Sequence, residues 1–141
     1  MTVTFAGHGD FHYKEETKTA LYNVLENLIL EGADTFYLGG YGNFDILCAE
    51  TVKKLKEVYP HIKSLLVIPY LDKKYDLALY DESVYPPLEN TPPRFAISKR
   101  NEWMAENSDI VVAYVNHTWG GAFKMLSYAK RKKRKIINIS L

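Results

Sequence analysis

The sequence predicts an α/β protein: a Rossmann-like, doubly wound sheet of about five parallel strands with helices on both faces. Apolar runs of strand length alternate with segments of helical periodicity along nearly the whole chain. One run, Ser64–Ile68, is almost entirely apolar, which is typical of a parallel strand buried on both faces. Glycine turns follow the first, second and fourth apolar runs, where a strand would give way to a helix. Together these three observations predict the fold class.

The first half of the chain is expected to form three strands and two helices. Residues 2–7 begin with a β-branched run and form the first strand. Residues 15–31 carry apolar side chains at helical spacing until a glycine ends the helix. The run at 34–38 forms the second strand, and helical spacing returns over residues 44–59. The apolar run at 64–68 forms the third strand.

Residues 70–93 interrupt this alternation. They hold four of the six prolines and four tyrosines. A connection of this length in a compact domain is usually a lid, a binding loop or disorder, and the tyrosines and leucines argue against disorder. We therefore expect this segment to close one side of a binding site or to mediate self-association.

The alternation resumes after the prolines. Residues 94–107 are expected to be helical, and the β-branched run at 109–115 forms the fourth strand. Residues 121–132 form the last helix and residues 136–139 the last strand. No repeat and no domain boundary is evident, so residues 1–141 are expected to form one domain.

Composition narrows the range of functions. Hydrophobic residues make up 47% of the chain and charged residues 25%, as in ordinary globular proteins. The net charge of +1 creates no strong field towards nucleic acid or an anionic membrane. A single cysteine, Cys48, allows no internal disulfide and favours a reducing compartment. No signal peptide is evident and no apolar stretch approaches the ~20 residues that span a bilayer, so we expect a cytoplasmic protein without a membrane partner.

Glycine turns at three predicted strand ends are candidates for ligand binding. In an open parallel sheet, ligands bind beyond the carboxyl ends of the strands, where the strand order reverses. With the order 3-2-1-4-5, the first and fourth strands flank that point. Backbone amides in such turns approach phosphate closely at the positive end of a helix. The alternative is that the glycines only permit tight packing. The expected ligand-binding residues in these turns are Gly7, His8, Asp10, Gly39, Gly40, Tyr41, Gly42, Asp45, His117, Thr118, Trp119, Gly120 and Gly121.

Arg100 is a further candidate for ligand binding. It shares the apolar face of its predicted helix with Ile97 and Met104. An arginine on the buried side needs an anionic partner, which is either a structural carboxylate such as Asp109 or a ligand phosphate. On the second interpretation, Arg100→Ala is expected to abolish ligand binding while leaving the protein folded.

The region around Arg100 resembles a known signature. The segment Ser98–Met104, followed by Asn107-Ser108-Asp109, a strand and a Gly-Gly turn, is similar to the pattern of the LOG cytokinin-activating phosphoribohydrolases. These enzymes belong to the SLOG superfamily, which also includes DprA-like proteins and bacterial YpsA-like proteins. The chain most resembles the YpsA-like branch, through Gly39-Gly40-Tyr41-Gly42, Tyr85–Glu89 and Trp119-Gly120-Gly121. The resemblance implies a Rossmann-like fold and a nucleotide or nucleotide-derived ligand, with Trp119 and Tyr41 towards the base.

The sequence departs from the LOG pattern where the enzymes carry their catalytic acids. LOG enzymes have a glutamate pair after the second glycine turn, but here Gly120–Met125 contains no carboxylate and has Lys124. An oxocarbenium-like transition state needs a nearby negative charge. We therefore expect a protein that senses or sequesters a nucleotide. The alternative is a phosphoribohydrolase acting on a nucleoside monophosphate. Its catalytic candidates are Arg100 with Asp45 or Glu50, and Asp10 and Glu82 are further carboxylates that no spacing rule separates from them.

Other partners are less favoured. The basic run Lys130–Lys135 suits the C-terminus of a helix, but DprA-like relatives bind single-stranded DNA, so nucleic-acid binding is a second alternative. The near-neutral charge and the single short patch argue against it. His8, His12 and His117 match no metal-ligand spacing, so neither a metal nor a cofactor is expected. The expected partners are a nucleotide-type small molecule and a second copy of the chain, as in a dimer.

Overall fold

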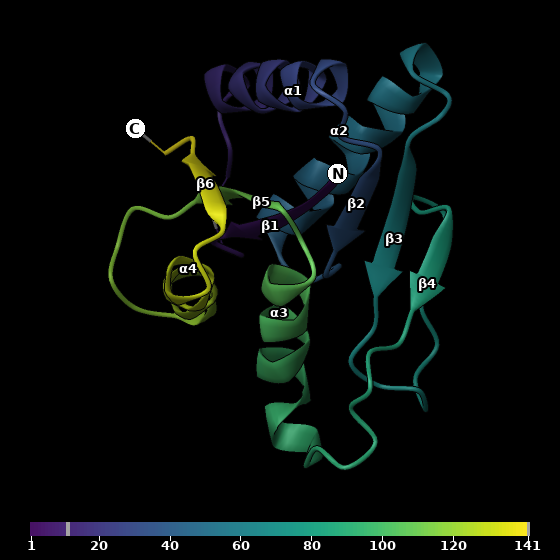
Figure 1. Cartoon of the computed structure of the whole chain (residues 1–141), viewed down its shortest axis with the longest axis vertical. Helices are drawn as coiled ribbons and strands as arrows, with labels where there is room; N and C mark the ends of the chain where they lie inside the picture. Colours follow the sequence, from purple (N-terminus) through teal and green to yellow (C-terminus); the bar gives the residue numbers. More distant parts are fainter. Residues whose placement is uncertain (11, 141) are drawn as a thin grey trace.

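The computed structural model describes residues 1–10 and 12–140. In these residues a parallel sheet is flanked by helices on both faces (Figure 1). The strands are β1 (Thr2–Gly7), β2 (Thr35–Leu38), β3 (Lys63–Val67), β4 (Glu82–Val84), β5 (Ile110–Tyr114) and β6 (Lys135–Asn138). The helices are α1 (Glu15–Leu30), α2 (Asn43–Val58), α3 (Ala96–Glu106) and α4 (Gly121–Arg131), and a 3-10 turn, η1 (Pro93–Phe95), precedes α3. The predicted α/β architecture is confirmed.

The strands follow the order β4-β3-β2-β1-β5-β6, and all five pairings are parallel. The order therefore reverses between β1 and β5, as predicted. These two strands pair over most of their length, with Phe5 opposite Val112 and Gly7 opposite Tyr114. The two strands end together at the same edge of the sheet.

The sheet has one more strand than the five predicted. The additional strand, β4, lies within the segment that was expected to be a lid or an interface, and it pairs with β3 at the edge of the sheet. Its three residues, Glu82, Ser83 and Val84, include two exposed polar side chains. An edge strand that buries no face needs no apolar run, so the sequence contains no hydrophobic pattern that predicts β4.

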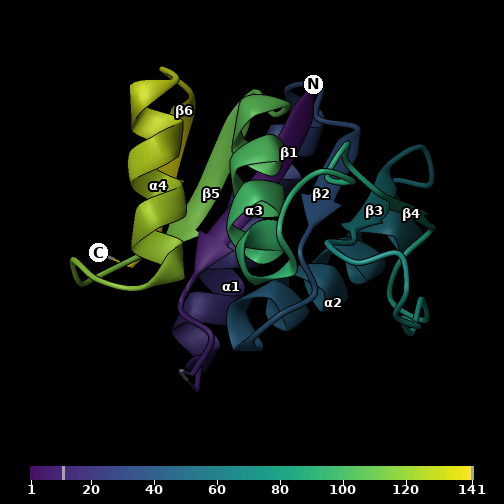
Figure 2. The same ribbon diagram turned by 90° about the horizontal axis from the view of Figure 1, so that it is seen from below.

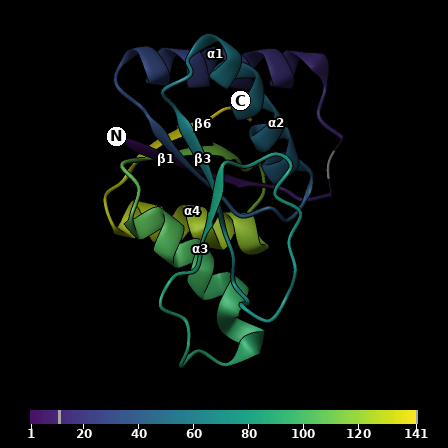
Figure 3. The ribbon, with the colours of Figure 1, turned by 90° about the vertical axis from the view of Figure 1, so that its right-hand side faces the viewer.

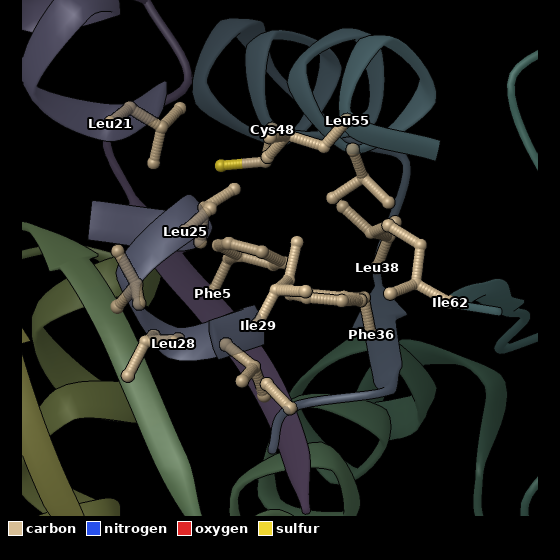
Figure 4. Close-up of a cluster of buried hydrophobic side chains, with 14 of the residues drawn as sticks. Phe5, Leu21, Leu25, Leu28, Ile29, Phe36, Leu38, Cys48, Leu55 and Ile62 are labelled. Carbon is tan, nitrogen blue, oxygen red and sulfur yellow. The ribbon is translucent and has the colours of Figure 1, made fainter. Parts of the chain in front are cut away.

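The helices form two layers, with α1 and α2 on one face of the sheet and α3 and α4 on the other (Figure 3). The first layer buries the larger apolar cluster, which includes Leu21 and Leu25 of α1 against Phe5 and Phe36 of the sheet (Figure 4). Cys48 of α2 is fully buried in this cluster, as expected for a small core residue. The second layer packs a smaller cluster on the opposite face.

The turns that lead into α2 and α4 share one backbone feature. Gly42 and Gly120, the residues that precede these helices, have φ angles of 88° and 90°. This region favours glycine because a Cβ atom is strained there. Both turns lie at carboxyl ends of strands and aim a helix N-terminus at the same edge of the sheet. Within the described chain, no helix is long and apolar enough to cross a membrane.

Candidate functional site

A pocket of about 350 Å³ opens at the carboxyl ends of β1 and β5, where the strand order reverses. Its walls come from the end of β1, the turn before α2, one face of α3 and the start of α4. The predicted residues that line it are Gly7, His8, Asp10, Tyr41, Asp45, Arg100, His117, Trp119, Gly120 and Gly121. The fold thus brings together side chains from widely separated parts of the chain.

Five predicted residues do not line this pocket: Gly39, Gly40, Gly42, Thr118 and Glu50. Gly39 and Gly40 line an adjoining cavity of about 240 Å³, which Tyr41 separates from the pocket by lining both. Thr118 is exposed and Glu50 is exposed on α2. The side chain of Glu50 lines a different hollow towards α1. Among the carboxylates considered on α2, the structure therefore brings only Asp45 into the same pocket as Arg100.

Gly42 serves packing rather than lining the pocket. An added Cβ atom at Gly42 would lie 2.6 Å from the Cα atom of Gly9. The turn after β1 and the turn before α2 can therefore touch only because both positions lack side chains. Asn43 N donates to the Gly9 carbonyl oxygen at 2.9 Å and links the same two turns. At this position the packing explanation for the glycine holds.

Arg100 is almost completely buried, with 1% of its surface exposed. Its Nη1 donates to the carbonyl oxygens of Gly39 and Val67, both at 2.8 Å, and its Nε donates to Asn101 Oδ1 at 2.9 Å. The two carbonyls lie at the carboxyl ends of β2 and β3, where the ladder leaves acceptors unused. Nη2 forms no hydrogen bond with the described residues.

The interpretation that Asp109 is the structural partner of Arg100 is wrong. Asp109 precedes β5 and lies at the amino end of the sheet, where its Oδ2 accepts from Thr2 N at 2.8 Å. Because α3 runs back along the sheet, Arg100 in its first half lies at the opposite, carboxyl end. The anionic neighbour of Arg100 is Asp45.

The side chains of Asp45 and Arg100 both lie against Gly39, where a Cβ atom would otherwise be. An added Cβ atom at Gly39 would lie 3.0 Å from Asp45 Oδ2 and 3.1 Å from Arg100 Cζ. Burial raises the pKa of the Asp45 carboxyl to about 6, although the Arg100 guanidinium and a hydrogen bond from the Tyr41 backbone N–H act in the opposite direction. The pocket therefore contains a carboxyl group whose pKa is raised above its ordinary value.

Three aromatic rings stack along another wall. The His8 and His117 rings lie 3.7 Å apart at an interplanar angle of 16°, and His117 and Trp119 lie 3.7 Å apart at 18°. Asn116 N donates to His8 Nε2 at 3.0 Å, so this nitrogen is an unprotonated acceptor. Burial and the neighbouring His117 lower the pKa of His8. Trp119 ends the stack and is 68% exposed, which leaves one indole face open.

The first turn of α4 completes the pocket. The first main-chain hydrogen bond of this helix runs from Lys124 N to Gly120 O at 3.1 Å, so the preceding amides have no acceptor within the helix. Gly121 and Ala122 carry two of these amides and line the pocket. Such amides, together with the helix dipole, attract anions.

Sequence reasoning missed several residues of the pocket wall. Ile97, Asn101 and Met104 come from the same face of α3 as Arg100, and Met125 comes from α4. Their helical spacing relative to Arg100 was the signal that would have found the first three. Within the described residues, histidine, cysteine, aspartate and glutamate form no group of three that could hold a metal ion.

The chain is similar to one family model and to several bacterial proteins. The family model YpsA, described as the YspA SLOG family, matches residues 12–78. A UPF0398 protein of Halalkalibacterium halodurans is 26% identical over 133 residues, which cover 84% of this chain and 69% of that protein. The uncharacterized SPbeta prophage-derived protein YoqJ of Bacillus subtilis is 28% identical over 137 residues, which cover 81% of this chain and 80% of YoqJ.

Solved structures share the fold at lower sequence identity. The DNA processing protein A of Streptococcus pneumoniae superimposes with a TM-score of 0.67 at 19% identity, over 96% of this chain and 48% of that protein. The corresponding Helicobacter pylori protein, which binds single-stranded DNA, gives 0.63 at 16%, over 96% and 63%. The molybdenum cofactor carrier protein of Chlamydomonas reinhardtii gives 0.64 at 18%, over 99% and 76%. This chain thus spans less than two thirds of either DNA processing protein.

Proposed function

Because this chain belongs to the YpsA-like branch of the SLOG superfamily, we propose that it binds a nucleotide or nucleotide-derived small molecule in the pocket at the ends of β1 and β5. One observation carries the proposal. An open indole face, a helix N-terminus, the buried Arg100 guanidinium and the half-buried Asp45 carboxyl group converge on one space of about 350 Å³. This volume lies within the range of small-molecule sites.

Each part of a nucleotide has a matching group in the pocket. The base stacks on the open face of Trp119, because an aromatic ring binds any base through its π-face. The phosphate lies at the amides of Gly121 and Ala122. Asp45, when ionised, accepts hydrogen bonds from ribose hydroxyls, and Nη2 of Arg100 supplies donors that form no hydrogen bond with the described residues.

The structural neighbours do not choose among ligand classes. One is a DNA-binding protein and another carries the molybdenum cofactor, and both are below 25% identity. The site's own residues support the small-molecule interpretation. The pocket is a concave site in which one aromatic ring, that of Trp119, has an exposed face. A binding site for single-stranded nucleic acid instead presents successive aromatic residues along a basic groove. A cytoplasmic location and self-association stay predictions.

We also propose that part of residues 70–93 covers the site beside Tyr41. Tyr75 and Tyr80 line the adjoining cavity on the far side of Tyr41, whose ring lies 5.3 Å from the Arg100 guanidinium carbon. Burial and the neighbouring Tyr41 raise the pKa of Tyr75 to about 12, so the two tyrosines lie close together. Movement of this segment would therefore move the ring that separates the pocket from the cavity.

A second candidate function is cleavage of an N-glycosidic bond. It is favoured by one observation: Asp45 lies in the pocket beside Arg100 and has a pKa of about 6. A carboxylate in this position would stabilise a developing oxocarbenium ion, the role that no residue at the start of α4 can take. Glu50 lies outside the pocket and is not part of this candidate.

The test is a panel of nucleoside monophosphates, nucleosides, ribose 5-phosphate and a short oligothymidylate. A ligand at 100 times its Kd should stabilise the protein by about 2.7 kcal/mol, which raises the Tm by several degrees. Stabilisation by a monophosphate without release of base supports the binding protein. Free base detected by chromatography supports the glycosidase. Stabilisation by the oligonucleotide alone, or by none of the panel, would refute the proposal.

A further inference from the structure

A groove lies between α3 and α4, next to the nucleotide pocket. Its volume is about 660 Å³, against about 350 Å³ for the pocket. Figure 2 shows the two helices side by side on one face of the sheet. Ile97, Asn101, Gly121 and Met125 line both spaces, so the groove is continuous with the pocket.

The groove is basic. Arg94 lines it from η1, and Lys124 and Arg131 line it from α4, against a single acidic side chain, Glu102. Glu102 already pairs with Lys99 at 3.5 Å, whereas the three cations form no ion pair with the described residues. Lys124 and Arg131 are seven residues apart and share one face of α4. Their charges therefore point to an anionic occupant.

Because the pocket and the groove are continuous, a ligand group in the groove can be joined covalently to a phosphate in the pocket. Gly121 lies where pocket and groove meet, and its amide belongs to the turn proposed to bind the nucleotide's phosphate. A group joined to that phosphate would enter the groove beside Lys124, one turn further along α4. Tyr128 lines the groove beyond it, and the Arg131 guanidinium carbon lies 5.6 Å from its ring centre.

We propose that the ligand is a dinucleotide, whose second nucleoside is joined through the pocket phosphate and lies in the α3–α4 groove. This inference rests on the proposed function. From Gly121 to Arg131 helix α4 rises about 15 Å, which accommodates one further nucleoside and its linkage but no long strand. The linkage is either a pyrophosphate or a phosphodiester, since both present the same anionic oxygens to Lys124.

The test compares three adenine ligands and their guanine counterparts. These are AMP, the phosphodiester dimer ApA and diadenosine pyrophosphate, with oligoadenylates of increasing length as a fourth arm. Calorimetry on the full chain should give at least tenfold tighter binding for one dinucleotide than for the monophosphate. The tighter dinucleotide identifies the linkage.

Charge reversal in the groove separates this inference from the proposed function. The variant Arg131→Glu, which changes a residue of the groove that does not line the pocket, should remove the advantage of the dinucleotide and leave the Kd of the monophosphate within about twofold. Lys54→Glu, exposed on α2 and lining a different hollow, is the matched control and should change neither.

Two results would overturn the inference while the proposed function stands. Dinucleotides that bind no tighter than the monophosphate would show that the groove is not used. An affinity that keeps rising with oligoadenylate length would identify a nucleic-acid track instead. If no monophosphate binds at all, the proposed function fails first and the inference falls with it.

Discussion

Nη1 of Arg100 lies 2.8 Å from the carbonyl oxygen of Gly39 and ties helix α3 to the end of β2. The same nitrogen holds the last residue of β3 through the Val67 carbonyl oxygen. Arg100 thus braces the edge of the sheet on which the pocket is built. Only Nη2 of Arg100 is left to bind a ligand. A substitution at Arg100 is therefore expected to lower the stability of the fold as well as ligand binding.

Arg100→Ala is predicted to lower the free energy of unfolding by about 3–5 kcal/mol, contrary to the expectation from sequence that the fold would be unaffected. The substitution leaves the carbonyl oxygens of Gly39 and Val67 without their donor and Asp45 without its cation. Urea unfolding measures the change. The control is Lys99→Ala, at the exposed position directly before Arg100. It should lower the free energy of unfolding by less than about 0.5 kcal/mol. Equal small losses in both variants would contradict the bracing role.

Gly42→Ala and Gly121→Ala are predicted to change stability in opposite directions. At Gly42 the methyl group meets the Gly9 backbone and the φ angle is 88°, so a loss of about 2 kcal/mol or more is expected. At Gly121 nothing lies within 4 Å of the added atom, and alanine in the first turn should gain up to about 1 kcal/mol. Thermal unfolding of the two variants shows whether each glycine is required for packing or can be replaced by alanine. A similar loss in both would refute the assignment.

Asp45→Asn is predicted to stabilise the protein above pH 6 and to weaken nucleotide binding. The pKa of Asp45 is raised in the folded protein from 3.8 to about 6, so its contribution favours folding below about pH 4 and is lost as the pH rises through about 6. Since one pKa unit corresponds to about 1.4 kcal/mol, the gain at pH 8 should approach about 3 kcal/mol. Unfolding at pH 4 should differ little from that of the wild type. Glu50→Gln, exposed on the same helix, is the control, and no gain at pH 8 would contradict the burial of an ionised carboxylate.

His8→Gln is predicted to reduce the loss of stability in mild acid. The pKa of His8 lies below its ordinary value of 6.5 because of burial and the nearby His117, so the folded state resists protonation. Its stabilising contribution is present above pH 6.5 and is lost as the pH falls below that value. Glutamine keeps an acceptor for Asn116 N but does not titrate. A difference between pH 7 and pH 5 that matches the wild type would show that this imidazole is not the group responsible.

The sequence predicted the elements that bury a face and missed the one that does not. Local sequence patterns correctly predicted several elements. These patterns are the apolar runs of β1, β3 and β5 and the glycines before α2 and α4. The order β3-β2-β1-β5-β6 followed from the topology of parallel crossovers. Strand β4 buries no face and left no pattern.

The site was predictable to the level of its turns but not of its contacts. The glycine turns and the face of α3 were correctly placed at one edge, because parallel topology dictates it. Which carboxylate accompanies Arg100 depends on the angle at which α2 leaves its turn, and no sequence spacing records that angle. The stack of His8 on His117 joins residues 109 positions apart and is equally invisible in the sequence.

The most direct test of the nucleotide site uses the fluorescence of Trp119. The chain contains two tryptophans, and Trp103 packs against Tyr37 at a centroid distance of 5.2 Å. In a Trp103→Phe variant, Trp119 is the only tryptophan, and its exposed indole reports directly on stacking. A nucleoside monophosphate should change this fluorescence saturably, and ribose 5-phosphate, which lacks a base, should not. Unchanged fluorescence at millimolar concentrations of all four common monophosphates would contradict the account.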